Sequence, residues 1–306
     1  MGHIICIGQS ALDFTTALSH PIIENQKYRI TDIVESGGGP AFNASYLCGM
    51  WGAEVSLVSR IGEDENGKKL RQMAESVHVN LDMLIPDLEY KTAYSYIFTN
   101  TKNGSRTLFN FPGKASNVNY AFPEKEVSVI LSDGHEPEMT AEAIKKYPHA
   151  ISIADAGSYR ESTMQVAKMV DYLVCSEDFA RQYTGKDLVI DYWQQCVEVF
   201  EQIEKINHKH VVITLGESGL LYRDHGNIVH FPAYRVKAID TNGAGDIFHG
   251  AFAYGMSHQM PLIDILKMSS MASAISVQYP GSQSAIPTLD MLGKGLLQAG
   301  EQISIK

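Results

Sequence analysis

Asp240-Thr241-Asn242-Gly243-Ala244-Gly245-Asp246 is the stretch of sequence that decides the fold. The residues before it, Tyr234 to Ile239, have the pattern of a strand, and Ile247 to Phe252 after it have that of a helix start. Glycine lets a backbone approach a ligand closely, and free N–H groups at a helix start favour an anion. With the carboxylate of Asp246 beside them, such amides suit phosphoryl transfer. A turn with no function is the alternative explanation of the same pattern.

Length and composition indicate an ordinary globular enzyme. The chain has 306 residues, 44% apolar and 20% charged, which suits one large α/β domain with an inserted subdomain. The net charge of −10, with no Lys/Arg-rich run, favours neither a nucleic-acid nor a membrane partner. The cysteines show no CxxC spacing, so we expect free thiols in a reducing compartment. Without an apolar run of membrane-spanning length, the expected location is cytoplasmic.

Strand-like and helix-like segments alternate along most of the chain, which predicts a mostly parallel sheet covered on both faces. The predicted strands are His3–Ile7, Glu54–Arg60, Val127–Leu131, Ala150–Ala154, Tyr172–Val174 and Val211–Leu215, followed by a hairpin of Leu220–Arg223 and Ile228–Phe231. The predicted helices are Pro40–Gly52, Gly67–Val77, 191–206, 245–257, 261–278 and 288–299. Helical spacing in 191–206 predicts a core face of Trp193, Cys196, Val197, Phe200 and Ile203.

A few segments do not fit this alternation. Lys27–Glu35 is a half-exposed strand pattern that Gly37-Gly38-Gly39 should end. Thr92–Thr99 and Arg106–Phe111 read as a hairpin turning at Asn103-Gly104. We expect these segments to form a small sheet that projects from the domain.

Gly37 to Asn43, with the sequence GGGPAFN, is a second candidate site. Its amides can face a ligand, and the Asn43 side chain both donates and accepts hydrogen bonds, which suits sugar hydroxyls. A loop before a capped helix explains the pattern equally. Asp13, in the loop expected from Gly8 to Asp13, could accept two hydroxyl hydrogens at once.

These motifs together resemble those of the ribokinase-like sugar kinases, also called the phosphofructokinase-B family, over nearly the whole chain. The resemblance implies a single domain over 1–306, a three-layer α/β/α fold and a β lid formed by about 14–36 and 90–112. It implies Asp246 as catalytic base and the backbone of Gly243, Ala244 and Gly245 as anion hole. Sugar binding would fall to Asp13, Gly38, Gly39 and Asn43, and nucleotide binding to Thr214, Gly216 and Gly219 of a T-x-G-x-x-G turn.

The chain departs from the family pattern around its metals. The family's Asn-x-x-Glu motif, which organises Mg²⁺ and phosphates, appears here with Ser176 and Phe179, and only Glu177 keeps a carboxylate, which could act through water. A potassium ion beside the anion hole would take oxygens from Asp240, Asn242, Ser276, Tyr279 and Gly281, although a family Ser in that loop is Ala285.

Gly62 to Lys69 matches seven of the eight positions of a GxxxxGK[ST] phosphate-binding loop. The eighth position, which should be Ser or Thr, is Lys69, and three acidic residues inside the loop would repel a triphosphate. The same residues fit a structural Gly-x-Asp-x-x-Gly element of the sugar kinases better.

The prediction is an ATP-dependent carbohydrate kinase that uses Mg²⁺, with K⁺ as a candidate activating ion, and that acts on a neutral ketose or related small sugar. GGGPA, Asn110-Phe111-Pro112 and Phe248-His249-Gly250-Ala251 look most like the ketohexose and sulfofructose kinase branch, and Pro40 stands where ribokinases often have Lys. We include Asn110 and Arg106 among the substrate residues; an anionic sugar would need a clamp, for which Arg106, Lys114 and His135 are the candidates.

Two alternatives remain. A nucleoside kinase would need aromatic stacking, which Phe42, Tyr94, Tyr96 and Phe109 could supply. A non-catalytic sugar-binding regulatory protein would fit the altered Asn-x-x-Glu motif. The resemblance also implies a homodimer, because lid strands in this family often pair between subunits and exposed sheet edges invite such pairing.

Overall fold

The computed structural model describes residues 2–102, 105–118, 120–301 and 303. Its largest element is sheet A, in which six parallel strands are extended by an antiparallel hairpin at one edge. In spatial order sheet A contains β12 (Asn227–Phe231), β11 (Leu220–Asp224), β10 (His210–Thr214), β9 (Tyr172–Ser176), β8 (Ile151–Ala156), β7 (Val129–Ser132), β1 (Ile4–Ile7) and β4 (Val55–Val58). The predicted parallel sheet and its closing hairpin are therefore confirmed.

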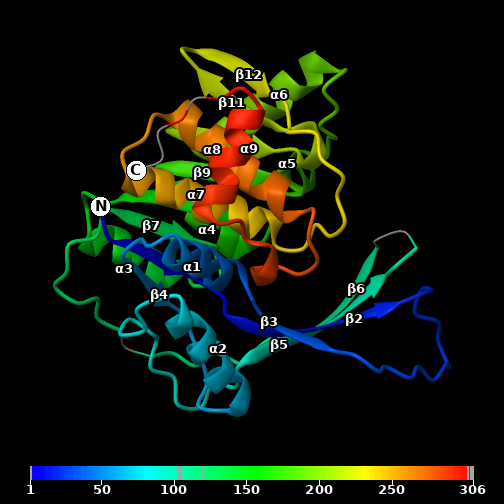
Figure 1. Ribbon diagram of the computed structural model, residues 1–306. Coiled ribbons are helices and arrows are strands. Elements are labelled where there is room, and N and C mark those ends of the chain that lie inside the picture. Colours follow the sequence, from blue (N-terminus) through cyan, green and yellow to red (C-terminus); the bar gives the residue numbers. More distant parts are fainter. Residues whose placement is uncertain (1, 103–104, 119, 302, 304–306) are drawn as a thin grey trace.

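Helices cover both faces of sheet A (Figure 1). One face packs against α1 (Pro40–Met50), α2 (Glu65–Ser76), α7 (Ala244–Ser257), α8 (Leu262–Ser276) and α9 (Leu289–Gln298). The other packs against α3 (Pro137–Lys146), α4 (Glu161–Met169), α5 (Glu177–Thr184) and α6 (Trp193–Glu204). Because strand side chains alternate between faces, Ile4 and Cys6 enter the first core while Ile5 and Ile7 enter the second. This is the predicted three-layer fold.

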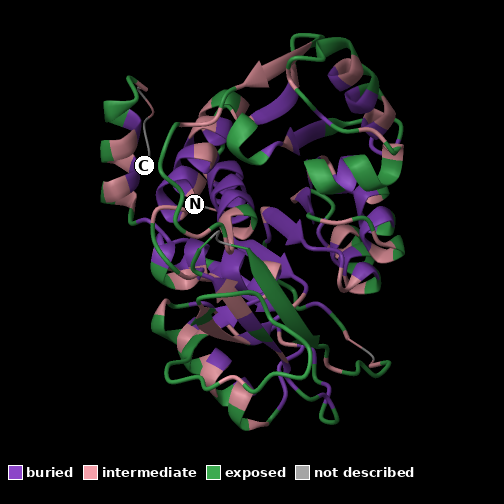
Figure 2. Cartoon of the chain, turned by 90° about the vertical axis from the view of Figure 1, so that its right-hand side faces the viewer, coloured by how far each residue is buried: buried purple, intermediate pink, exposed green. Residues whose placement is uncertain are grey.

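Sheet B is smaller and projects from the body of the domain (Figure 1). Its order is β3 (Val34–Gly38), β2 (Ala11–Leu18), β5 (Ala93–Asn100) and β6 (Arg106–Phe111), with β2 and β5 parallel and the other pairs antiparallel. The predicted β5–β6 hairpin is confirmed, and its Asn103-Gly104 turn lies outside the described residues. Much of the projecting sheet is exposed, in contrast to the buried strands of sheet A (Figure 2).

The two faces of sheet B differ in chemistry. The register places Tyr94 opposite Phe111 and Tyr96 opposite Phe109, and the Phe14 ring stacks on that of Tyr96 with centroids 5.2 Å apart. The residues between them point to the other face, because side chains alternate along a strand. That face carries Asp13, Ser95 and Asn110. Sheet B therefore has an aromatic face and a second face, called its polar face below, on which Asp13, Ser95 and Asn110 lie beside the Ile97–Leu108 pair.

Three local predictions are wrong. The strand predicted at Lys27–Glu35 starts only at Val34 and continues through Gly37 and Gly38, because β2 supplies a partner there; Asp13 lies in β2 and not in a loop. Residues 234–239 form no strand, since β12 already ends sheet A; instead the Ile239 and Asp240 N–H groups donate to Val277 O.

The core face of α6 also differs from its prediction. Trp193 is 40% exposed and Val197 is only partly buried, whereas Val199 is buried beside Cys196 and Phe200. Trp193 is the first residue of α6, and the buried residues of this helix begin one turn later, at Cys196. Within the described residues, no helix is both long and apolar enough to span a bilayer.

Candidate active site

The turn at the start of α7 presents free backbone donors. Gly243 precedes the helix in the left-handed region, with φ 74°, which glycine adopts at little cost. Among the described residues, the N–H groups of Gly243 and Gly245 have no protein acceptor, and Ala244 N–H has only a long contact of 3.4 Å to Thr241 O. A Cβ added to Gly245 would meet nothing within 4 Å. The turn is therefore open and can bind an anion through its amides.

Asp246 lies in the first turn of α7 and is partly buried. Its Oδ2 accepts a hydrogen bond from Nδ2 of Asn43 at 2.7 Å. Burial and, to a smaller extent, the nearby Asp155 raise the pKa of Asp246 to about 7, and the Asn43 hydrogen bond opposes the rise. A pKa near the working pH is what a general base needs. The residues predicted as base and as sugar ligand thus meet directly.

In the glycine loop before α1, neighbouring atoms lie so close to the α-carbons that a side chain would not fit. Gly39 has φ 91°, and a Cβ there would lie 2.4 Å from Gln9 O. A Cβ at Gly38 would lie 2.2 Å from Oδ2 of Asp13, so Asp13 packs directly on this glycine. Burial raises the pKa of Asp13 to about 6, against a hydrogen bond from Ser95 that lowers it. The structure therefore brings Asp13 and the 38–43 loop together, and their role in sugar binding stays a prediction.

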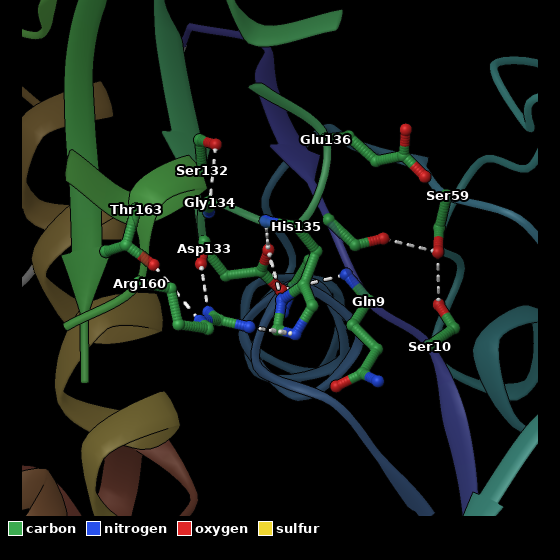
Figure 3. Close-up of polar contacts among 12 residues, drawn as sticks. Gln9, Ser10, Ser59, Ser132, Asp133, Gly134, His135, Glu136, Arg160 and Thr163 are labelled. Atoms are coloured by element: carbon green, nitrogen blue, oxygen red, sulfur yellow. Dashed lines mark hydrogen bonds and ion pairs between the residues drawn. The ribbon is translucent and has the colours of Figure 1, made fainter. Parts of the chain in front are cut away.

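Asp133 holds this corner of the site in place (Figure 3). It follows β7 directly, is 2% exposed, and its Oδ2 accepts from Gln9 N–H at 2.8 Å and from Ala41 N–H at 3.2 Å. Burial would raise the pKa of Asp133, but His135 and these N–H donors bring it below its usual value. Asp133 thereby fixes the start of the helix that carries Asn43. Sequence reasoning missed it, although an acid directly after a buried strand is a recognisable signal.

His135 links Asp133 to Arg160 (Figure 3). Nε2 of His135 lies 2.6 Å from Nη1 of Arg160, and an arginine can only donate, so this nitrogen is the acceptor. The ring proton is then on Nδ1, which faces Oδ1 of Asp133 at 3.0 Å. Both ring nitrogens of His135 are therefore occupied, which removes it as a free anion clamp. Arg160 is the cation at this corner that sequence reasoning missed.

A second buried pair lies beside Asp246. Asp155, in β8, and His249, in α7, are 7% and 3% exposed, and Nδ1 of His249 lies 3.2 Å from Oδ2 of Asp155. Burial raises the pKa of Asp155, and the neighbouring His249 opposes that rise. Neither residue was predicted to belong to the site.

The predicted nucleotide residues lie at the carboxyl ends of β9 and β10. Thr214 ends β10, and Gly216 has φ 54° with only Oε1 of Glu177 near its missing Cβ, at 3.9 Å. Gly219 is required by packing, since a Cβ there would lie 2.1 Å from Phe231 O. Glu177 begins α5, and burial raises its pKa. This edge of a parallel sheet is where ligands bind in such folds.

Ser176 and Phe179, the two departures from the Asn-x-x-Glu motif, have structural contacts. Ser176 caps α5, accepting from Phe179 N–H at 3.1 Å and donating to Gly157 O at 2.8 Å. Phe179 is fully buried. Within the described residues, no group of three His, Cys, Asp or Glu side chains could hold a metal ion. Glu177 lies at this edge together with the carboxylates of Asp178 and Glu217, and its role in binding Mg²⁺ stays a prediction.

The two loops predicted to hold potassium lie side by side. Asp240 joins them, accepting from Asn242 N–H on one oxygen and from Gly281 N–H on the other, each at 2.9 Å. Gly281 has φ 88°, and Ser276 O accepts from Tyr279 N–H at 3.0 Å. The arrangement brings the predicted ligands into one region, and their role in ion binding stays a prediction.

The two substrate residues predicted in β6 differ in position. Nη1 of Arg106 donates to Oδ1 of Asn242 at 2.9 Å, so this side chain spans from sheet B to the anion turn. Asn110 makes one long contact, with Oγ of Ser95 at 3.5 Å, on the face that carries Asp13. Lys114, the remaining clamp candidate, is exposed.

The segment that resembles a phosphate-binding loop is occupied by its own side chains. Asp64 caps α2 by accepting from Gly67 N–H at 2.9 Å and also accepts from Thr92 N–H at 3.0 Å. Lys69 pairs with Glu35, and Lys68 pairs with Glu65. The backbone of the segment from Gly62 to Lys69 therefore offers no open site for a phosphate. This supports a structural role for the segment.

Residues 1–289 match the pfkB family of carbohydrate kinases. The chain belongs to this family. It is 24% identical to a ribokinase of Lactococcus lactis subsp. lactis over 304 residues, covering 94% of this chain and 95% of that protein. As a carbohydrate kinase, it is a phosphotransferase that acts on an alcohol group.

Solved structures show the same fold. The ribokinase of Thermotoga maritima superposes with a TM-score of 0.82 at 24% identity, covering 97% of this chain and all of that one. The ribokinase of Arabidopsis thaliana, solved with ribose and ATP, gives a TM-score of 0.82 at 19% identity, covering 96% and 98%. At this identity the likeness establishes the fold, and the predicted ketohexose or sulfofructose branch of the kinase stays a prediction.

Proposed function

We propose that this kinase transfers the γ-phosphate of ATP to a primary hydroxyl of a small neutral sugar. The observation that carries the proposal is the 2.7 Å hydrogen bond between Asn43 and Asp246. This contact supports one site in which the predicted sugar-binding loop and the predicted base lie next to the open amides of the α7 turn. ATP as donor is supported by the family and by the related ribokinase solved with ribose and ATP.

In this mechanism the sugar lies between Asp13, the 38–43 loop and the polar face of sheet B. Asp246 takes the proton of the attacking hydroxyl, whose oxygen bonds to the γ-phosphorus in line while the bond from that phosphorus to the β–γ bridging oxygen breaks and ADP leaves. The N–H groups of Gly243, Ala244 and Gly245 stabilise the charge that develops on the transferred group. Sheet B, with segments of about 14–36 and 90–112, acts as the lid within a single domain.

The nucleotide lies over Thr214, Gly216 and Gly219. Glu177 would hold Mg²⁺ through water, which fits a chain whose described residues offer no three-carboxylate cluster, because Mg²⁺ commonly keeps waters and binds phosphates. The ion supplies charge neutralisation on the phosphates. Oxygens of the 240–242 and 276–281 loops would hold K⁺ beside the anion turn.

The identity of the sugar has two leading candidates. The motifs of the chain favour a ketohexose, whereas its relative from Lactococcus is a ribokinase. The polar face beside Asp13 suits either, because both are neutral polyols. Arg160 has no carboxylate partner in the described part of the chain. Because this cation could pair with the carboxylate of a substrate, a sugar acid is the third compound to test.

ADP release over a panel of ribose, deoxyribose, fructose, a sugar acid and nucleosides, in K⁺ and in Na⁺, tests the proposal. We expect turnover with one neutral sugar and a lower rate in Na⁺. Asp246→Asn should reduce that turnover by at least about 10²-fold, since a positioned base contributes about 10²–10⁴-fold. Near-normal turnover by a folded Asp246→Asn protein would refute the assigned base.

The two alternatives, a nucleoside kinase and a non-catalytic regulatory protein, predict different outcomes in the same assay. A nucleoside kinase loses support from the structure, because Phe42 is fully buried and Tyr94, Tyr96 and Phe109 point to the face of sheet B away from Asp13. Phosphorylation of a nucleoside alone would nevertheless establish it. Sugar binding with no ADP release would support the regulatory protein.

We also propose a homodimer formed through the aromatic face of sheet B. Tyr96, Phe109 and Phe111 are 38%, 47% and 45% exposed there, and contiguous exposed apolar surface commonly marks an interface. The four cysteines are buried and free, which suits the cytoplasmic location predicted for the kinase.

A further inference from the structure

His249 is surrounded by hydrogen-bond acceptors on both ring nitrogens. Nδ1 lies 2.7 Å from Gly245 O, and Nε2 lies 3.1 Å from Val174 O. A carbonyl oxygen can only accept, so each of these contacts requires a proton on the facing nitrogen. Both nitrogens carry a proton only in the imidazolium form.

The charge of such an imidazolium needs compensation, because an unpaired ion is costly inside a protein. Oδ2 of Asp155 supplies it at 3.2 Å from Nδ1. A protonated Asp155 donating to a bare Nδ1 would leave the lone pair of that nitrogen facing Gly245 O at 2.7 Å, which is repulsive. The contacts therefore favour an ion pair between a carboxylate and an imidazolium.

This ion pair borders the α7 turn. His249 lies one helical turn after Asp246, and it binds the carbonyl of Gly245, the residue directly before Asp246. Asp155, in β8, contacts His249 there, and both charges act on the Asp246 carboxyl group. Asp246 thus has an anion and a cation of one buried pair near its carboxyl group.

We propose that Asp155 and His249 are positioning residues that hold the α7 turn and set the proton affinity of Asp246 through opposite charges. The inference rests on the base assigned to Asp246 in the proposed function. The other groups near Asp246 are Asp133, which adds negative charge, and Asn43, which donates a neutral hydrogen bond. His135 and Arg160 act electrostatically on Asp155, and His135 also contacts Asp133.

The proposal predicts shifts of opposite sign from the two halves of the pair. His249→Asn removes the cation and leaves the Asp155 anion, which raises the pKa of Asp246. The acidic limb of the plot of kcat/KM against pH should therefore move to higher pH, by about one unit for charges several ångströms apart. Asp155→Asn leaves the cation, so the limb should move to lower pH by a similar amount. The double variant should return close to the wild-type limb.

His3→Asn is the matched control. His3 is also a buried histidine, hydrogen-bonded to Ser56 at 2.8 Å, but it lies just before β1, at the amino end of that strand. It should lower the melting temperature and leave the limb where it is. Limb shifts of the same sign in both pair variants, or loss of stability with no shift, would overturn the proposal.

A measurement on the wild-type protein covers the case in which the variants do not fold. ¹⁵N NMR of the histidine side chains should show both ring nitrogens of His249 protonated at pH 8; a neutral ring would overturn the inference without reference to activity. If instead Asp246→Asn kept normal turnover, the base itself would be wrong, and the NMR result on His249 would still stand.

Discussion

Asp246 combines its proposed catalytic task with a cost to stability. Its raised pKa of about 7 means that the folded protein binds a proton more tightly than the unfolded chain between roughly pH 4 and 7. The contribution of Asp246 to the free energy of unfolding therefore falls as the pH rises through that window. At pH 8 the folded protein must hold this partly buried carboxylate in its ionised form.

Asp246→Asn should consequently be more stabilising at high pH than at low pH. Asn cannot ionise, so the difference in melting temperature between variant and wild type should grow in favour of the variant from pH 5 to pH 8. Thermal unfolding at both pH values measures it. An equal difference at the two pH values would contradict the raised pKa.

Asp13→Asn should affect sugar binding selectively. A hydrogen bond to a charged group contributes about 1.5–3 kcal/mol, so the KM for the sugar should rise at least about tenfold while the KM for ATP stays unchanged. Since the pKa of Asp13 is about 6, the wild-type KM for the sugar should also rise as the pH falls below about 6.

Steady-state kinetics at varied sugar and varied ATP separates the two constants. Asp290→Asn, which changes an exposed acid of α9, is the control and should alter neither. A rise in both KM values after Asp13→Asn would indicate a general disturbance of the site and would contradict the assignment of Asp13.

The first turn of α7 depends on two glycines in different ways. Gly243 has a positive φ, and a Cβ there would lie 2.8 Å from Cβ of Ser282, so Gly243→Ala should destabilise the protein by about 1–3 kcal/mol. Gly245 is helical, and a Cβ there meets nothing within 4 Å. Gly245→Ala should be neutral or stabilise by about 0.4–1 kcal/mol.

Denaturant unfolding of this matched pair tests the geometry of the turn without reference to activity. Equal destabilisation by both substitutions would contradict the left-handed conformation assigned to Gly243. The same comparison explains why the spacing of the motif matters: one glycine sets the backbone direction, and the other keeps its surroundings open.

At the scale of the whole molecule, the aromatic face of sheet B is open to solvent. Three of its rings are about half exposed. If this face forms the proposed dimer, Phe109→Glu should yield monomers, because a buried unpaired charge is strongly unfavourable at an interface. Light scattering after size exclusion measures the mass. Lys294→Glu on exposed α9 is the control and should remain dimeric; a monomeric wild-type protein would refute the interface.

Much of the organisation followed from sequence because it depends on short contiguous patterns. Alternation of apolar strands and amphipathic helices predicts the three layers, and the run from Asp240 to Asp246 predicts an open anion turn with an acid at its end. The strand predictions were wrong where the presence or absence of a neighbouring strand outweighed the local sequence pattern. Gly37 and Gly38 form a strand because β2 lies beside them, and 234–239 does not because sheet A ends at β12.

Sequence alone therefore determined the family, the layered fold and the individual motifs, since each is encoded within a few neighbouring residues. Only the tertiary structure decided which motifs meet. Asn43 and Asp246 are 203 positions apart and share a hydrogen bond, and Asp155 and His249 pair from a strand and a helix. Burial and proximity set the proton affinity of Asp246, and both arise only once the chain is folded.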